Sequence, residues 1–227
     1  METMTHDPVF VSGKVDTPRH FAQLVLPVLD GSGSMTEQAR GNISKAQATN
    51  MAVRELLTRI KISGVAQNFT CGVLTFDHTV KERLAPMPIA GVDDNDSYDP
   101  LAGHGGGTRI FLALEEAERV VDGFLQQAPE GGVPHSAVIV LMSDGCCSRP
   151  DLARTIAHRI KTGPNGYRVT IACTLFATVG NTDVAGEALL KEIASDPVKY
   201  YKTVYDAETL RAFMLASASA ASGSQIP

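Results

Sequence analysis

The sequence predicts an α/β protein with a doubly wound, mostly parallel six-stranded sheet and helices on both faces. Apolar runs typical of buried strands alternate with amphipathic helical patterns, which favours parallel strands joined by helical crossovers. Two apolar runs follow each other with no helix between them, which predicts one antiparallel strand at an edge of the sheet. The length of 227 residues suits a single domain of this class.

The first half of the chain contains three predicted strands and one helix. A short apolar strand is expected at 24–29, and apolar residues at three- and four-residue steps predict a helix over 42–61. The strand 69–76 turns at "DHT" into a shorter strand at 80–84, and this hairpin supplies the antiparallel edge strand. Residues 86–107 form a long loop rich in glycine, proline and aspartate, and loops of this length are usually functional or mobile.

Helices and strands continue to alternate in the second half, which ends in a helix. The expected elements are a helix at 108–127, a strand at 136–144, a helix at 151–161, a strand at 168–176, a helix capped by Thr182 or Asp183, a strand at 199–204 and a helix at 206–218. We expect an N-terminal arm at 1–20, one domain at 21–216 and a flexible tail at 217–227, because terminal Ser, Ala and Gly residues favour fraying.

The composition argues against several classes of protein. Hydrophobic residues make up 44% and charged residues 20% of the chain, so a core of normal size can form. The formal net charge of −5 argues against a broad surface for nucleic acid or for an anionic membrane. No apolar stretch approaches the roughly 20 residues of a membrane span, and the N-terminal sequence lacks the pattern of a signal peptide. We therefore expect a cytoplasmic protein.

The chain has four cysteines. Cys71 and Cys173 lie inside apolar runs and are expected to be buried thiols. Cys146 and Cys147 are adjacent, so a disulfide between them would be strained. Free loop thiols are the simpler interpretation of this pair, and a soft-metal or redox role is the alternative.

Polar side chains are expected to converge at the carboxyl edge of the sheet. The first strand ends in Asp30, which is followed by Ser32 and Ser34, and a later strand ends in Asp144. Thr108 closes the glycine-rich stretch "GHGGGT" that precedes a helix. In an open parallel sheet, ligands bind beyond the carboxyl ends of the strands, near the switch in strand order. We therefore expect these five residues to form one site.

This set offers only oxygen ligands, which Mg²⁺ and Mn²⁺ prefer. Two carboxylates neutralise a divalent ion, and hydroxyls fill further positions without adding charge. The ion would then keep affinity for one more anion. The sequence therefore predicts a metal site with an open coordination position.

The pattern "DGSGS", with a distant threonine and a distant aspartate, resembles the metal-ion-dependent adhesion site of von Willebrand factor type A domains. By this resemblance, Ser32, Ser34 and Thr108 would contact the metal directly in at least one state. Asp30 and Asp144 would bind it directly or through water. The open position would accept an Asp or Glu side chain of a partner protein.

The resemblance covers about residues 20–215 and implies an interaction module rather than an enzyme. The C-terminal sequence "LLKEIASDPVKYYKTVYDAETLRAF" is similar to that of bacterial stand-alone members associated with tellurium resistance and related stress operons. In such operons, kinase-like and phosphatase-like proteins are the implied partners. A phosphatase-like hydrolase that uses the ion as a Lewis acid is the alternative, although His104 is the single general-base candidate on the site loops.

Further residues are candidates for a rim that selects partners. Asp93, Asp94 and Asp96 in "DDNDSYD" would repel acidic partners that dock wrongly, although a solvated loop is the simpler interpretation. His104 could orient a ligand. Arg109 could pair with a carboxylate of the site or of the partner.

Overall fold

The computed structural model describes residues 20–127, 132–145, 147–180, 183–224 and 226. The arm predicted at 1–20 therefore lies, except for His20, outside the described residues.

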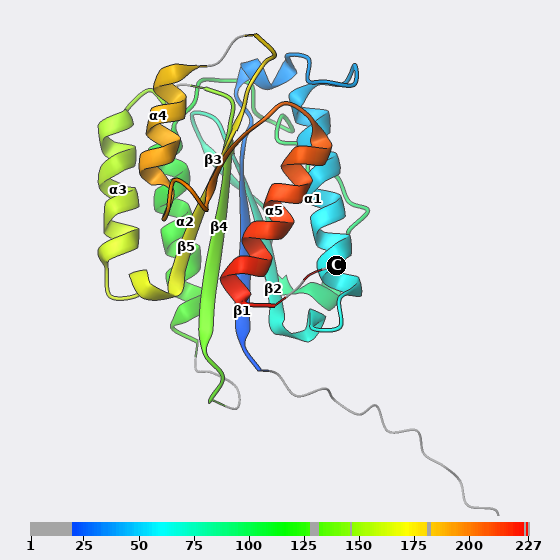
Figure 1. The fold of residues 1–227 in the computed structure, drawn as a ribbon, viewed down its shortest axis with the longest axis vertical. Coiled ribbons are helices and arrows are strands. Elements are labelled where there is room, and N and C mark those ends of the chain that lie inside the picture. Colours follow the sequence, from blue (N-terminus) through cyan, green and yellow to red (C-terminus); the bar gives the residue numbers. More distant parts are fainter. Residues whose placement is uncertain (1–19, 128–131, 146, 181–182, 225, 227) are drawn as a thin grey trace, which may run out of the picture.

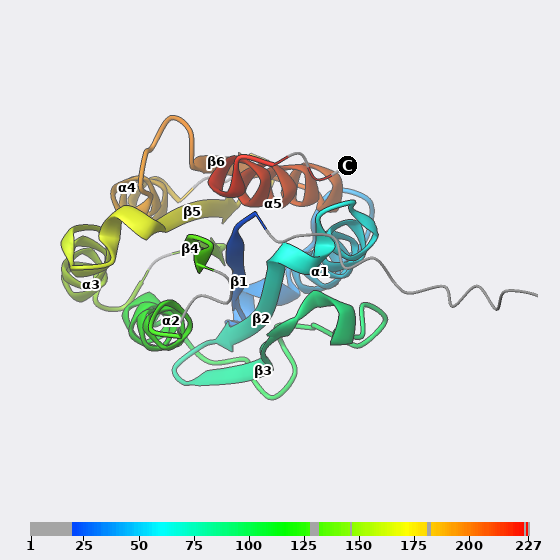
Figure 2. The same ribbon diagram turned by 90° about the horizontal axis from the view of Figure 1, so that it is seen from below.

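One six-stranded sheet forms the centre of the protein (Figure 1), and its strands follow the order β3-β2-β1-β4-β5-β6 (Figure 2). The strands are β1 (Ala22–Asp30), β2 (Phe69–Phe76), β3 (Val80–Pro88), β4 (His135–Ser143), β5 (Val169–Phe176) and β6 (Tyr201–Val204). All neighbouring strands are parallel except β2 and β3, which form an antiparallel hairpin with β3 at the edge. The predicted fold class is confirmed, including its antiparallel edge strand.

The described residues contain five α-helices, which cover both faces of the sheet (Figure 2). One face packs against α1 (Lys45–Ile62) and α5 (Ala207–Ser222). The other face packs against α2 (Ile110–Leu125), α3 (Pro150–Thr162) and α4 (Val184–Ile193). None of the helices in the described part of the chain combines the length and the apolar character that a membrane span needs.

A capping box fixes the start of α1. The Ser44 hydroxyl accepts a hydrogen bond from the Gln47 amide at 3.1 Å, and the Gln47 side chain accepts one from the Ser44 amide at 2.9 Å. These two bonds satisfy backbone donors that would otherwise lack partners in the first turn. The helix therefore begins at Lys45, three residues later than the sequence pattern predicts.

Helix α5 continues to Ser222, so the prediction of a flexible tail is wrong for residues 217–222. Ser217 and Ala218 are 3% and 0% exposed, and the Gln23 side chain donates a hydrogen bond to the Ala218 carbonyl at 3.3 Å. Small side chains let the helix lie close to the sheet, chiefly against β4. Ser217 and Ala218 are therefore packing residues, although the composition of this stretch suggests a frayed end.

Candidate metal-binding site

The carboxyl ends of β1 and β4 bring two acidic residues to the switch in strand order. The two strands are adjacent and parallel, and Leu29 pairs with Met142. Asp30 is the last residue of β1 and Asp144 directly follows β4, so both emerge at the same edge. From β1 the chain crosses first to β2 on one side and later to β4 on the other. Open α/β sheets bind ligands at this kind of edge.

Asp30 is a fully buried carboxylate. It accepts hydrogen bonds from the Ser32 amide at 2.8 Å and from the Ser143 hydroxyl at 2.5 Å. Burial is the main cause that raises the pKa of Asp30 to about 6; the nearby charge of Asp144 adds to the effect, and the hydrogen bonds oppose it. A cation beside Asp30 would favour the ionised form, so this carboxylate is poised to gain from metal binding.

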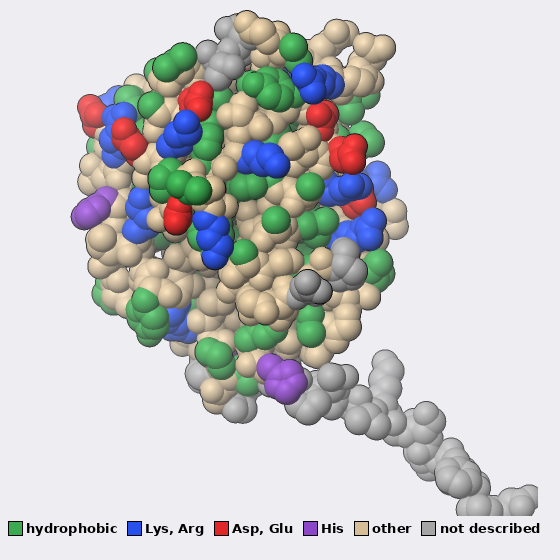
Figure 3. Space-filling model, viewed as in Figure 1, with side chains coloured by type: hydrophobic (Ala, Val, Ile, Leu, Met, Phe, Trp, Pro, Cys, Tyr) green, Lys and Arg blue, Asp and Glu red, His purple; other side chains and the backbone are tan. Residues whose placement is uncertain are grey.

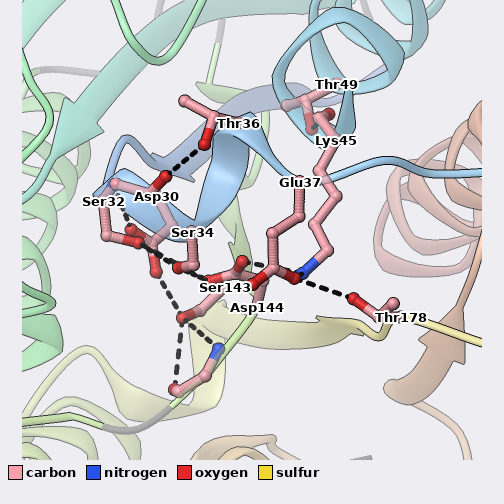
Figure 4. Close-up of polar contacts among 12 residues, drawn as sticks. Asp30, Ser32, Ser34, Thr36, Glu37, Lys45, Thr49, Ser143, Asp144 and Thr178 are labelled. Atoms are coloured by element: carbon pink, nitrogen blue, oxygen red, sulfur yellow. Dashed lines mark hydrogen bonds and ion pairs between the residues drawn. The ribbon is translucent and has the colours of Figure 1, made fainter. Parts of the chain in front are cut away.

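The loop after β1 directs two hydroxyls at Asp144 (Figure 4). The hydroxyl oxygens of Ser32 and Ser34 lie 3.1 Å apart. Ser34 donates to Asp144 Oδ1 at 2.8 Å, and the Ser32 hydroxyl lies 3.5 Å from the same oxygen. The Thr36 hydroxyl closes this turn on the Gly33 carbonyl at 2.8 Å. The structure thus brings four of the five predicted ligands into one hydrogen-bonded group.

The fifth predicted ligand, Thr108, reaches the same edge through its loop. The Gly33 amide donates to the Gly106 carbonyl at 3.1 Å, and the Ser148 amide donates to the Thr108 carbonyl at 3.0 Å. Thr108 is half-buried in this position. The loop of Thr108 is therefore bonded to the serine loop on one side and to the loop after β4 on the other.

Close approach of the loops requires a glycine at position 31. A Cβ atom added to Gly31 would lie 2.2 Å from the Pro100 carbonyl oxygen and 2.9 Å from the His104 Cβ. The long loop between β3 and α2 thus packs directly against the "DGSGS" turn.

Lys45, the first residue of α1, is the main site residue that sequence reasoning missed. Its side chain is only 3% exposed, and its ammonium donates to Asp144 Oδ2 and Glu37 Oε2, each at 2.9 Å (Figure 4). Glu37 also accepts from the Thr178 hydroxyl at 2.9 Å, and the pKa of Glu37 is lowered chiefly by the hydrogen bond from Lys45. A signal was present, because Lys45 stands one turn before Thr49 on the buried stripe of α1. A lysine in a buried stripe needs an acidic partner.

Asp77, also missed, anchors the loop that leads into α2. Its Oδ1 lies 2.9 Å from His104 Nδ1, its Oδ2 accepts from the Gly106 amide at 3.0 Å, and its carbonyl accepts from the Arg109 amide at 2.9 Å. Burial alone would raise the pKa of Asp77, but hydrogen bonds from Thr79, His104 and Gly106 outweigh it and hold the pKa well below its usual range. Asp77 therefore acts as an ionised clamp under the site.

The predicted rim residues His104 and Arg109 have surroundings that differ from those expected of a rim. The His104 side chain is 0% exposed, and its Nε2 lies 3.0 Å from the Thr75 hydroxyl, so it supports the loop from inside. Arg109 is exposed at the start of α2. Among the described contacts, Lys45 rather than Arg109 pairs with Asp144.

Of the three predicted rim aspartates, Asp94 lies beside the far end of α1, so the rim prediction is wrong for Asp94; Asp93 and Asp96 stand in the same turn, and their role in a rim stays a prediction. Asp94 accepts hydrogen bonds from Thr58 at 2.8 Å and from Lys61 at 3.0 Å. The site lies at the first residue of α1, which has 18 residues. At about 1.5 Å per residue, Thr58 and Lys61 lie roughly 20 to 24 Å further along the helix axis than Lys45. Polar groups near the end of α1 hold this acidic turn away from the site.

The oxygen donors at the edge fit a hard divalent cation. Asp30 and Asp144 supply carboxylates, and Ser32 and Ser34 supply neutral hydroxyls. Across the residues that the structure describes, no group of three or more His, Cys, Asp and Glu side chains is arranged to hold a metal. A cation at this edge would therefore need the serine hydroxyls among its ligands.

The cysteines within the described residues are free and buried. Burial raises the pKa of the Cys71 and Cys173 thiols, so the prediction of buried thiols is confirmed for both. Cys147 is 7% exposed, and Cys146 lies outside the described residues.

A sequence profile of the von Willebrand factor type A domain matches residues 25–146. This segment runs from within β1 to just beyond β4 and contains every predicted metal ligand. No curated protein sequence matches the chain.

Several solved structures share the fold. The pilus adhesin SpaC from Lactobacillus rhamnosus GG superposes with a TM-score of 0.69 at 14% identity, over 88% of this chain and 30% of SpaC. Proximal thread matrix protein 1 from the mussel byssus, with a zinc-occupied MIDAS motif, gives 0.59 at 20% identity, over 86% of this chain and 46% of that protein. An aerotolerance-related membrane protein from Bacteroides fragilis NCTC 9343 gives 0.56 at 16% identity, over 87% and 98% of the two chains. The chain thus spans less than half the length of the first two proteins.

Proposed function

The chain belongs to the von Willebrand factor type A family, and we propose that it is a metal-dependent protein–protein interaction module. Asp30, Ser32, Ser34, Thr108 and Asp144 would hold a divalent cation, Mg²⁺ or Mn²⁺. When bound, the cation offers an open coordination position to an Asp or Glu side chain of a partner. The chain's own residues orient this position and keep the metal ligands fixed before the partner arrives.

One observation carries this proposal. Two carboxylates and two serine hydroxyls from separate segments meet at the switch edge, with Ser34 bonded to Asp144 at 2.8 Å. A turn made only for structure would not need Asp30 to be fully buried, because ionised carboxylates are costly to bury without a cation.

The identity of the ion follows from donor chemistry. Carboxylate and hydroxyl oxygens suit Mg²⁺ and Mn²⁺ better than softer metals. The mussel protein carries zinc in its MIDAS motif, so zinc is a necessary comparison in any titration. Tighter binding of zinc than of Mg²⁺ would follow the general affinity order and would not by itself identify the cellular ion.

The surface beside the site supports a protein ligand. Glu37 is half-exposed and bonds to Thr178, whose neighbour Val179 is 58% exposed. Val179 therefore offers exposed apolar area, beside a residue bonded to Glu37, that a protein partner could cover. On the face shown in Figure 3, basic and acidic side chains are interspersed, which argues against a nucleic-acid surface there.

The biological setting that we propose is a bacterial stress-response or signalling assembly in the cytoplasm, of the kind associated with tellurium resistance. The C-terminal sequence similarity described above supports it. Kinase-like or phosphatase-like proteins are then the proposed partners. The pilus adhesin and the membrane protein among the structural neighbours share only the fold with this chain.

The alternative is a phosphatase-like, metal-dependent hydrolase. Its candidate general base, His104, is fully buried, with one nitrogen 2.9 Å from Asp77 and the other 3.0 Å from Thr75. This burial favours the binding module. Phosphatase assays of the pure protein with Mg²⁺ or Mn²⁺ test the alternative, and metal-dependent turnover that Asp30→Ala abolishes would support it.

Affinity capture from native lysate tests the proposal. We expect a partner to be retained in Mg²⁺ and released in EDTA, and Ser34→Ala to retain none. Thr70→Ala, a change on β2 away from the site, is a matched hydroxyl control. A partner that stays bound in EDTA and to Ser34→Ala would contradict the metal-bridged mechanism.

A further inference from the structure

A buried positive charge lies directly against the proposed metal site. The Lys45 ammonium is 2.9 Å from Asp144 Oδ2, while the other oxygen of the same carboxylate faces the Ser34 hydroxyl at 2.8 Å. The side chains of Lys45 and Asp144 are 3% and 0% exposed, so little solvent screens the pair. One carboxylate therefore serves the lysine and the metal site together.

The lysine changes the charge balance of the site. Asp30, Asp144 and Lys45 are all buried and together carry one negative charge. A divalent cation would leave this buried group with one positive charge. Glu37, on the far side of Lys45, is half-exposed, and its charge is partly screened by solvent.

We infer that Lys45 makes metal binding conditional on an acidic ligand: Lys45 weakens the site for the cation alone, and an incoming carboxylate restores the balance. The cation and the carboxylate of the partner would then bind cooperatively. Because linkage is reciprocal, the partner would raise metal affinity by the same factor as the metal raises partner affinity. This inference rests on the proposed function, whose metal site it uses.

Substitution of Glu37 provides a second test, because its expected effect on cation affinity is opposite in sign to that of Lys45. It accepts from the Lys45 ammonium at 2.9 Å and offsets part of its charge from the solvent side. Loss of the Lys45 charge should tighten the site for the cation. Loss of the Glu37 charge should weaken it. A purely structural role for the pair would make both variants worse.

The experiment is calorimetric titration of the full chain with Mg²⁺, in chloride and in acetate at equal ionic strength. Lys45→Met should bind Mg²⁺ about ten-fold more tightly than the parent, since a like charge a few ångströms away at an effective dielectric constant of about 20 is worth more than 1.4 kcal/mol. Glu37→Gln should bind Mg²⁺ more weakly. Acetate, as the carboxylate probe, should tighten Mg²⁺ binding in the parent and have a smaller effect in Lys45→Met.

Lys61→Met is the matched control, because Lys61 pairs with Asp94 at 3.0 Å at the far end of the same helix. It should bind Mg²⁺ as the parent does. If Lys45→Met binds no more tightly than Lys61→Met, the inference is overturned. If Lys45→Met does not fold, Glu37→Gln decides through the acetate comparison: weaker Mg²⁺ binding that acetate tightens more than in the parent supports the inference, and any other result overturns it. A parent chain that binds no divalent cation would instead refute the proposed function itself.

Discussion

The buried carboxylate of Asp30 should make the metal-free protein less stable as the pH rises. The test is Asp30→Asn, which keeps the size of the side chain and removes its titration. The amide can still bond to Ser143, because that hydroxyl can accept as well as donate. Any constant effect of the amide is independent of pH, so the pH-dependent part of the difference reports the ionisation of Asp30.

The sign and size follow from the shift in pKa. The pKa of Asp30 rises from 3.8 to about 6 on folding, so the folded chain holds this proton more tightly than the unfolded chain. The penalty is absent below the unfolded pKa of 3.8, grows between about pH 4 and 6, and is complete above that range. At about 1.4 kcal/mol per pKa unit, the full penalty is about 3 kcal/mol.

Urea unfolding in EDTA at a series of pH values measures this effect. The free energy of unfolding of Asp30→Asn minus that of the parent should rise by about 3 kcal/mol across the window and then stay level. Ser143→Ala should extend the window to higher pH, because it removes a hydrogen bond that opposes the rise in the folded pKa of Asp30. Mg²⁺ should stabilise the parent and not Asp30→Asn. A difference that stays flat between pH 4 and pH 6 would refute the reasoning.

Three further predictions concern the loops around the site. Ser34→Ala should weaken Mg²⁺ binding at least about ten-fold in calorimetry and change stability in EDTA by less than about 1 kcal/mol, because its hydroxyl bond is exposed to solvent; a large loss of stability would instead make Ser34 a structural residue. Asp77→Asn should lower the free energy of unfolding by about 2–3 kcal/mol, because the ionised clamp holds several buried donors, and equal stability in urea would contradict the clamp. Gly31→Ala should cost about 2 kcal/mol or more, because its Cβ would lie 2.2 Å from the Pro100 carbonyl; Gly64→Ala, where a Cβ meets nothing within 4 Å, is the control for thermal melting.

The sheet could be predicted because its central strands leave a strong signal. β1 is buried along its whole length, and so is β4 after its first two residues, which gives continuous apolar runs. The edge strand β3 is mostly exposed and has a weaker pattern, but the absence of a helix after β2 identified it. The end of α5 was missed because Ala and Ser carry no periodic apolar signal, although tertiary contacts bury Ser217 and Ala218.

The candidate site was predictable to the extent that the fold determines it. Parallel strands place their carboxyl ends at one edge, so Asp30 and Asp144 had to meet once β1 and β4 were adjacent. No such constraint fixes where on the surface the acidic turn at 93–96 lies. Its position depends on Thr58 and Lys61, whose side chains reach it from α1. The sequence predicts that this turn is negatively charged, but it does not predict that the turn contacts α1.

Lys45 alters what the ligand set implies about function. Counted from the sequence, Asp30 and Asp144 would neutralise a divalent ion and leave it with affinity for one more anion. The buried ion pair of Lys45 with Asp144 offsets part of that negative charge. The lysine binds one oxygen of the Asp144 carboxylate, and Ser34 binds the other. A site of this kind binds its ion best when an acid from another protein is present. Release of the partner protein would then lower the affinity of the chain for the ion, so the ion would leave with the partner.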